Sequence, residues 1–432
     1  MLKTVRSTII VTLVALFPFS ASIAAQDASG QFKHPAVEVV MKSAQYKASM
    51  AFLEKDHDRI VEQNIALQQI PAPLRQEEQK ARAFAALLKE AGLSDVTIDE
   101  EGNVLGLRKG TSNSGEIVAF VSHLDTVFDR KVDLTIKREG TKLKAPGIID
   151  DTRGLASILG IVRAMNAANV KTTKDVLFVG SVGEEGLGDL RGVKYLLNKG
   201  QYKERIKSFI AFDGNAPDQI ANTAAGSKRY EVRFNGPGGH SFKAFGTVNP
   251  MYALANVISD LSKVQAPAGT TYSVGVIGGG TSVNSIPVEA WMLVDMRSSS
   301  ATDLAALEKT FLQFPERAVA AENNTRSTKN GKITVDVKLV GDRPAGNTSK
   351  DQDLVKAALA ASAAHGWNPR LAESSTDQNV PMSLGIPAIT IASGIGDRNH
   401  SLDEYLDVEP KASLRSLGFA LTTLLATTGI AK

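Results

Sequence analysis

Four short stretches of almost uninterrupted apolar residues constrain the fold of this chain more than any other feature of its sequence. Each is about as long as a β-strand, and they span residues 116–122, 175–181, 208–212 and 386–392. Continuous apolar runs of this length are typical of strands buried on both faces, as in a parallel sheet covered by helices. Helical patterns precede them at 37–69 and 76–91 and separate them at 154–168 and 190–197. The sequence therefore predicts an α/β domain built on a mostly parallel sheet between helices.

The middle of the chain has a different pattern. Candidate strands of an antiparallel or mixed sheet lie at 229–234, 271–277, 289–295 and 332–340, with helical stretches at 250–263 and 301–321 among them. We therefore predict that a smaller α+β domain, residues 226–342, interrupts the α/β domain. The two segments of the larger domain are then 26–225 and 343–432.

The N-terminus has the layout of a secretory signal peptide. Lys3 and Arg6 precede an apolar run at 7–17, and small residues follow as far as Ala25. The apolar run is shorter than the roughly 20 residues that a membrane-spanning helix needs, which disfavours the alternative of an uncleaved anchor. We predict cleavage near Ala24 or Ala25, so that residues 1–25 are removed, and a secreted or periplasmic protein with no stable membrane anchor.

The composition of the chain limits the partners, catalytic groups and metal ligands that it can use. The 49 Lys and Arg residues nearly balance the 46 Asp and Glu residues, so nothing points to a nucleic-acid partner. Cysteine is absent, which excludes thiol catalysis, cysteine-bound zinc, iron–sulfur clusters and disulfides. A metal site in this chain must therefore use His, Asp and Glu, and only six histidines are present.

Polar residues follow the ends of the predicted strands, where open α/β sheets bind their ligands. They are His123 and Asp125, Asp150 and Asp151, Glu184 and Glu185, Asp213, and His400. Each motif alone has an ordinary structural explanation: a surface pair, a solvated turn or a helix N-cap. Together they favour divalent cations, because the like-charged pairs would otherwise repel one another. Zinc accepts imidazole and carboxylate ligands together, and two zinc ions ~3.5–4 Å apart can share a bridging carboxylate.

These motifs resemble those of the dinuclear zinc exopeptidases that include peptidase T, glutamate carboxypeptidase and aminoacylase. The resemblance covers the chain from about Ile70 to its end, with motifs in the family's order at 123–127, 147–154, 184–186, 213 and 400–401. One departure is Thr152-Arg153, which replaces a single lysine of the second motif. The resemblance implies a zinc-exopeptidase catalytic domain with an inserted dimerisation or lid domain.

The resemblance also implies roles for individual residues. His123 and Asp213 would hold one zinc, Glu185 and His400 the other, and Asp150 would bridge them; cobalt or manganese could substitute. Asp125 would hydrogen-bond His123 and fix its tautomer, and Glu184 would act as general base. A cis peptide bond is expected between Asp150 and Asp151.

In the inserted domain, His240 is implied to reach the active site of the partner subunit in a homodimer, and Asn284 and Arg297 to bind substrate. A guanidinium suits recognition of a carboxylate. The segments 374–377 and 393–396 are expected to shape the pocket. The remaining histidines, His34, His57 and His365, match no motif and are interpreted as surface or structural residues.

The function predicted from these observations is hydrolysis of small peptides by an exported dizinc enzyme. By the same resemblance, Asp213 rather than glutamate at the fourth ligand position implies a peptidase T-like aminopeptidase or tripeptidase. A carboxypeptidase or an N-acyl-amino-acid deacylase would use the same motifs and is the alternative. A non-catalytic peptide-binding protein on the same scaffold would be expected to lack Glu184 or a ligand, and neither is missing here.

Overall fold

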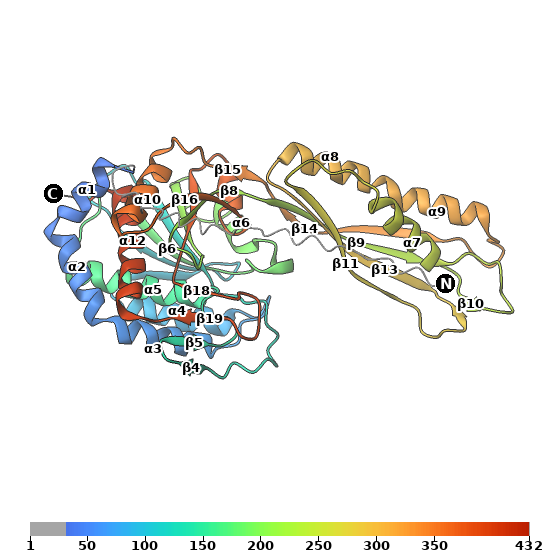
Figure 1. The fold of residues 1–432 in the computed structure, drawn as a ribbon, viewed down its shortest axis with the longest axis horizontal. Coiled ribbons are helices and arrows are strands. Elements are labelled where there is room, and N and C mark those ends of the chain that lie inside the picture. Colours follow the sequence, from blue (N-terminus) through green and yellow to red (C-terminus); the bar gives the residue numbers. More distant parts are fainter. Residues whose placement is uncertain (1–31, 432) are drawn as a thin grey trace, which may run out of the picture.

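The larger lobe is built on a nine-stranded sheet whose centre is parallel. A computed structural model describes residues 32–431 of the chain, and the predicted signal peptide lies outside them (Figure 1). The central strands β3, β6, β7 and β17 run parallel, and every residue of β3, β6 and β17 is buried. Their bounds are Ile117–His123, Asp175–Ser181, Ile206–Phe212 and Ala388–Ile391. The four apolar runs therefore form the expected buried strands.

The edges of this sheet are mostly antiparallel, so the sheet is mixed. Its order is β1-β2-β6-β3-β7-β17-β8-β15, with β16 paired to β8. Within this set β2 is antiparallel to β6, and β17 is antiparallel to β8. The edge strands are β1 (Asp95–Ile98), β2 (Val104–Arg108), β8 (Gln219–Ala224), β15 (Gly346–Asn347) and β16 (Arg370–Ser374). The α/β fold with an inserted α+β domain is thus confirmed, with a larger antiparallel share than predicted.

Helices cover both faces because alternate side chains of each buried strand point to opposite sides. Val118 and Phe120 of β3 join a core with most of the helices, whereas Ala119 and Val121 pack with α6 and α11. The first group is α1 (Pro35–Lys42), α2 (Ala44–Lys55), α3 (His57–Gln68), α4 (Glu78–Glu90), α5 (Thr152–Ala167), α10 (Asp353–Ala364) and α12 (Pro410–Thr428). The second group is α6 (Arg191–Asn198) and α11 (Asn379–Ser383). No helix within residues 32–431 has the length and apolarity that crossing a bilayer requires.

The predicted helix at 37–69 is wrong as a single element, because the chain forms three helices there. Ser43 ends α1 in an extended conformation, and its hydroxyl accepts the Tyr46 N–H at 3.1 Å to begin α2. Asp56 separates α2 from α3. The predicted stretch at 301–321 likewise divides into α8 (Ala301–Phe311) and α9 (Gln313–Thr325). Helical periodicity continues across these breaks, because Ser43 and Asp56 are polar residues that interrupt no apolar stripe and Leu312, between α8 and α9, is itself apolar.

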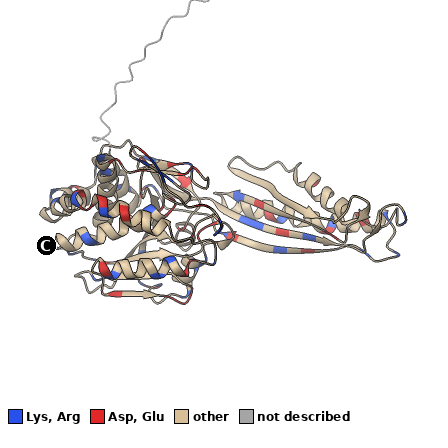
Figure 2. Ribbon diagram, turned by 90° about the horizontal axis from the view of Figure 1, so that it is seen from below, with Lys and Arg blue, Asp and Glu red and all other residues tan. Residues whose placement is uncertain are grey.

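A second sheet, which is entirely antiparallel, forms the smaller lobe, and this lobe is called the lid below. Its order is β11-β13-β9-β14. The strands are β9 (Gly226–Asn235), β11 (Thr270–Gly279), β13 (Glu289–Ser298) and β14 (Thr334–Arg343). Helices α7 (Pro250–Leu261), α8 and α9 pack on one face of the sheet and enclose an apolar core. Figure 2 shows charged residues spaced along the lid strands. Strand β9 carries Arg229, and β13 carries Asp295 and Arg297.

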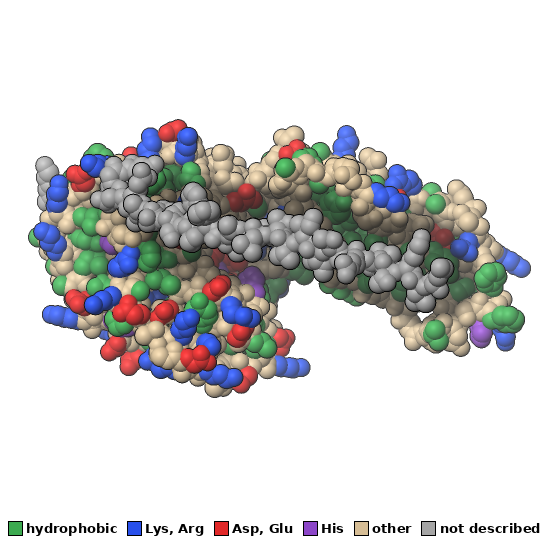
Figure 3. Space-filling model, in the orientation of Figure 1, with side chains coloured by type: hydrophobic (Ala, Val, Ile, Leu, Met, Phe, Trp, Pro, Cys, Tyr) green, Lys and Arg blue, Asp and Glu red, His purple; other side chains and the backbone are tan. Residues whose placement is uncertain are grey.

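A four-stranded sheet, β18-β19-β5-β4, lies beside the large one. Its strands are β4 (Lys137–Glu139), β5 (Lys142–Lys144), β18 (Gly396–Asp397) and β19 (Tyr405–Asp407). Leu143 of β5 pairs with Leu406 of β19. This pairing holds the chain before Asp150 next to the chain around His400, although 250 residues separate these two positions. The space-filling view shows the hollow between the two lobes (Figure 3).

Candidate metal centre and substrate pocket

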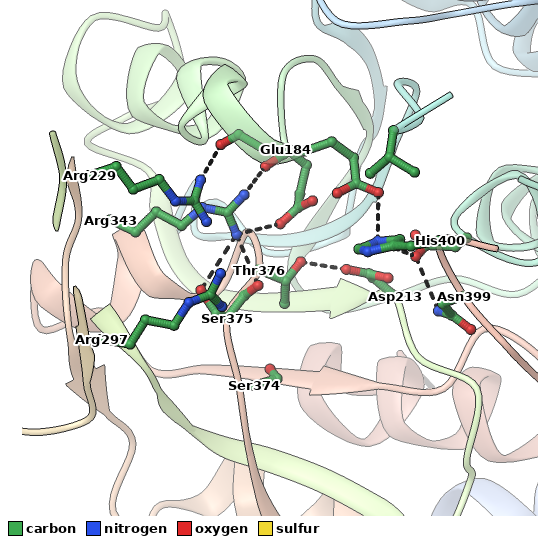
Figure 4. A pocket seen from close by; sticks show the side chains of 14 residues that line it. Glu184, Asp213, Arg229, Arg297, Arg343, Ser374, Ser375, Thr376, Asn399 and His400 are labelled. Atoms are coloured by element: carbon green, nitrogen blue, oxygen red, sulfur yellow. Dashed lines mark hydrogen bonds and ion pairs between the residues drawn. The ribbon is translucent and has the colours of Figure 1, made fainter. Parts of the chain in front are cut away.

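A pocket of about 390 Å³ lies where the carboxyl ends of the central strands face the base of the lid. Figure 4 shows that its two ends differ in chemistry. His400 and Asp213 lie at one end, three arginines from the lid strands lie at the other, and Glu184 lies between them. The predicted site residues that line the pocket are Asp150, Glu184, Glu185, Asp213, Arg297 and His400.

His123 ends β3 and is almost fully buried. Its Nε2 lies 3.0 Å from Asp150 Oδ1 and 3.9 Å from Asp213 Oδ1. Its Nδ1 lies 3.0 Å from the carbonyl oxygen of Asp125, which leaves Nε2 directed at the carboxylates. A histidine whose second nitrogen is held in this way has the arrangement that metal-binding imidazoles require.

The predicted hydrogen bond between Asp125 and His123 is present, and the backbone carbonyl oxygen of Asp125 makes it rather than its carboxylate. The carboxylate lies 3.7 Å from His123 Nδ1. Instead it accepts the backbone N–H groups of Glu184 at 3.0 Å and Glu185 at 2.8 Å. Asp125 is fully buried. Its carbonyl therefore orients His123, while its carboxylate fixes the loop that carries the two glutamates.

Asp150 lies between the two histidines. Its Oδ1 faces His123, and its Oδ2 lies 3.2 Å from His400 Nε2 and 3.1 Å from Asn399 Nδ2. The expected cis peptide bond joins Asp150 to Asp151. The Asp151 carboxylate accepts the N–H groups of His123 and Gly154, both at 3.2 Å, so it caps helix α5. A Cβ on Gly154 would lie 2.3 Å from the Ser122 hydroxyl, so this close approach requires glycine.

The remaining carboxylates complete the cluster. Glu185 Oε1 lies 3.0 Å from His400 Nε2, and the hydroxyl of Thr376 donates to Asp213. Three residues, His123, Asp150 and Glu185, each place a ligand atom within 4.8 Å of the others. His123, Asp151 and Asp213 form a second such group.

The charges in this cluster are unbalanced. Burial and the neighbouring carboxylates raise the pKa of Asp213 to about 6 and that of Glu185 to about 7. Hydrogen bonds to Asp150 and Glu185 raise the pKa of His400 to about 11. Burial raises the pKa of the neighbouring Asp377 to about 8, and the charge of Glu184 adds to it. Carboxylates whose ionisation is this costly, arranged around two imidazoles, are a donor set that fits divalent cations.

Three arginines from the lid form the other end of the pocket, and sequence analysis identified only Arg297. Arg297 Nε donates to Asp295 Oδ2 at 2.6 Å, and Arg229 Nε donates to Asp295 Oδ1 at 3.0 Å. Arg343, the last residue of β14, donates from Nη1 to Glu184 Oε1 at 3.0 Å and to the Ser375 carbonyl at 3.0 Å. Its Nη2 donates to the Glu184 carbonyl. No motif marked Arg229 or Arg343, because neither has a spacing that identifies it.

The structure does not bring His240 or Asn284 to this pocket. His240 belongs to β10 (Gly239–His240), which pairs with β12 (Ser285–Ile286) at the far tip of the lid (Figure 1). The three unassigned histidines are also elsewhere. His34 contacts Asp353, His57 contacts Asp58, and His365 contacts Tyr46.

A cluster of imidazoles and carboxylates at the carboxyl edge of an α/β sheet, under an inserted lid, defines a metal-dependent hydrolase of peptide or amide bonds. Comparison with known families agrees with this class. Residues 119–424 match the model of peptidase family M20/M25/M40, and the chain belongs to this family.

Individual relatives are distant. A protein of Pyrococcus abyssi, named as a candidate LysW-lysine/LysW-ornithine hydrolase, is 31% identical over 120 residues. This match covers 28% of the present chain and 32% of that protein, about a third of its length.

Solved structures cover far more of the fold. A tripeptidase from Staphylococcus aureus superposes with a TM-score of 0.71 at 20% identity, covering 86% of this chain and 99% of that one. A dinuclear metal-binding peptidase of the M20 family from Bacillus subtilis gives 0.62 at 19% identity, covering 88% and 99%.

Proposed function

We propose that this protein is a dizinc hydrolase of short peptides, with the activity of an aminopeptidase or tripeptidase. The observation that carries the proposal is the position of Asp150, whose two oxygens face His123 and His400 at 3.0 and 3.2 Å. A carboxylate placed in this way can bridge two cations. The similarity to a structure described as a tripeptidase supports the peptide assignment.

Five residues would hold the cations. His123 and Asp213 would bind one, Glu185 and His400 the other, and Asp150 both. When bound, such a pair supplies a Lewis acid for the scissile carbonyl and lowers the pKa of a bound water.

Glu184 would act as the general base of the reaction. It is buried, lies between the carboxylate cluster and the arginines, and has no place in the predicted ligand set. It would accept the proton from the attacking water and deliver it to the leaving nitrogen. The Asp125 carboxylate holds the backbone of the Glu184–Glu185 loop through two N–H groups, and Arg343 holds the side chain of Glu184.

Arg297 would bind the free carboxylate of the substrate. It lines the pocket opposite the metal-binding residues, and its side chain is 44% exposed. A planar guanidinium can pair with a carboxylate through two hydrogen bonds. His240 would complete the site from a second subunit, since it lies at the lid tip of its own chain. The substrate of a carboxypeptidase or of a deacylase of N-acyl amino acids carries the same free carboxylate. Binding at Arg297 is therefore compatible with all of these activities, and assays on different substrates distinguish them.

The proposal is tested with purified enzyme on di- and tripeptides with free or blocked termini. We expect close to two divalent ions per chain by mass spectrometry, loss of hydrolysis after chelation, and recovery with zinc, cobalt or manganese. Glu184→Gln should retain both metals but lose about 10²–10⁴-fold in turnover, the usual worth of a general base. Glu62→Gln, an exposed position on α3, is the matched control. Full activity of verified metal-free enzyme, or unchanged turnover of Glu184→Gln, would contradict the assignment.

A further inference from the structure

A second cavity lies beside the substrate pocket, on the face of the lid sheet that the helices do not cover. Its volume is about 420 Å³, within the ~300–1,000 Å³ typical of small-molecule sites. It shares Gly186, Arg229 and Arg297 with the pocket that contains the carboxylate cluster. The two cavities are therefore adjacent, and the two arginines line both of them.

Beyond these arginines the walls of the second cavity are largely apolar. Leu293 of β13 and Val340 of β14 come from the lid, and Leu187 comes from the loop that carries Glu184 and Glu185. Leu187 is 47% exposed, although it lies on a short, ordered loop of the larger lobe. Its exposed side chain adds to the apolar wall formed by Leu293 and Val340.

The charges around the two shared arginines are already arranged for one anionic group. Asp295 accepts hydrogen bonds from both Arg229 and Arg297, which leaves the pair of arginines with one net positive charge. Arg343 is committed to Glu184 and Ser375, and Arg229 also donates to the Gly186 carbonyl. Arg297 is thus the guanidinium best placed to receive a single carboxylate.

We propose that the second cavity is a specificity subsite for the side chain of the residue that bears the free carboxylate of the substrate. This inference rests on the proposed function. The carboxylate and the side chain of an amino acid leave the same Cα atom, so a carboxylate at Arg297 places the side chain within reach of both cavities. The metal-binding residues occupy the first cavity, and the apolar walls of the second match leucine, methionine or phenylalanine. The substrate class is therefore short peptides that end in a large apolar residue.

The size of the effect follows from burial of that side chain. One extra or missing methylene in an apolar pocket changes specificity by roughly 10–200-fold. We expect wild-type kcat/KM to be about 10- to 100-fold higher for a peptide that ends in leucine than for the same peptide ending in alanine.

Gly275 offers a direct test, since it lines the cavity in strand β11. A Cβ at this position would meet no atom within 4 Å, and its φ lies outside the left-handed region. Gly275→Leu should therefore fill the cavity without disturbing the fold. We expect at least a tenfold lower kcat/KM for the leucine peptide and a change within about twofold for the alanine peptide.

Two further variants sharpen this test. Lys338→Leu adds the same side chain at an exposed position of β14, outside the cavity, and should change neither value. Leu187→Ala should reduce the preference for leucine even if Gly275→Leu fails to fold, which thermal unfolding would reveal. A wild type that hydrolyses both peptides equally, or variants that affect both alike, would overturn the inference alone. A metal-loaded wild type that hydrolyses neither would overturn the proposed function and the inference with it.

Discussion

The ion pair between Arg343 and Glu184 is the contact through which the lid reaches the proposed base, and replacing Arg343 by methionine tests its importance. Methionine keeps most of the aliphatic length but removes the guanidinium. The change deletes the 3.0 Å hydrogen bond to Glu184 Oε1, the 3.0 Å bond to the Ser375 carbonyl and the bond to the Glu184 carbonyl. Both Arg343 and Glu184 are 4% exposed, so water cannot replace these contacts without rearrangement.

The expected magnitude follows from that burial. Removing one partner of a buried ion pair typically costs about 3–5 kcal/mol, because the other charge remains buried without compensation. The surroundings increase this cost. Burial lowers the pKa of Arg343, but the charges of Glu184, Glu185 and Asp377 outweigh this effect and raise it, so the guanidinium interacts favourably with more than one carboxylate. Bound cations would offset part of it. We therefore expect a loss of about 2–4 kcal/mol in unfolding free energy and a 10- to 100-fold fall in kcat, about 1.4 kcal/mol per tenfold.

Urea unfolding and steady-state kinetics distinguish the roles that Arg343 could have. A residue that positions the base should lower kcat with little change in KM, whereas one that binds the substrate carboxylate should mainly raise KM. Arg343→Lys should recover part of the stability, because it keeps the charge but cannot donate to all three acceptors. If Arg343→Met unfolds at the wild-type urea concentration and turns over at the wild-type rate, the pair neither stabilises the loop nor positions Glu184.

Two further predictions concern histidines outside the metal cluster. If His240 acts on the partner's substrate, His240→Ala should lose about 10²–10³-fold in turnover with normal metal content; mixing it with Glu184→Gln should recover up to about half the activity per mixed dimer. No recovery on mixing, or an active monomer, would refute action in trans. Burial lowers the pKa of His365, which contacts Tyr46 and the Ala361 carbonyl and faces Arg415. The unfolded chain therefore binds a proton at His365 more tightly than the folded chain does. The contribution of His365 to stability is full above about pH 6.5 and falls as the pH drops toward the folded-state pKa. His365→Gln should flatten the fall in unfolding free energy between pH 7.5 and 5.5, and an unchanged slope would exclude this role.

The predictable part of the fold is the part in which burial dictates residue type. Strands β3 and β6 are buried on both faces, so their sequences contain little but apolar residues and their limits were found to within about a residue. Strand β16 of the same sheet is half-exposed, and its sequence, Arg-Leu-Ala-Glu-Ser, carries no such signal. The pairing of β5 with β19 was equally invisible, because contacts between distant short strands leave no local pattern.

The site shows the same division. The residues whose side-chain chemistry is specific, the two histidines and their carboxylates, could be identified from type and order and lie together in the structure. Arg343 could not, because arginine has many uses on a protein surface and its partner Glu184 is 159 positions away. Its location at the end of β14 explains its role: the last residue of a lid strand is the point where the chain returns to the larger lobe.

Asp125 shows that a motif can predict a contact without revealing which atoms make it. Its hydrogen bond to His123 was expected and comes from its carbonyl oxygen, whereas its carboxylate accepts the N–H groups of Glu184 and Glu185. Those N–H groups belong to the backbone, which has the same donors whatever the residue type, so no sequence pattern could reveal them. The consequence is mechanical as well as electrostatic. One buried side chain ties the end of β3, where His123 begins the metal cluster, to the loop that carries the proposed base and a proposed ligand. Arg343 holds the same loop from the lid. Glu184 is thus held by contacts from both lobes, the Asp125 carboxylate on its backbone and Arg343 on its side chain.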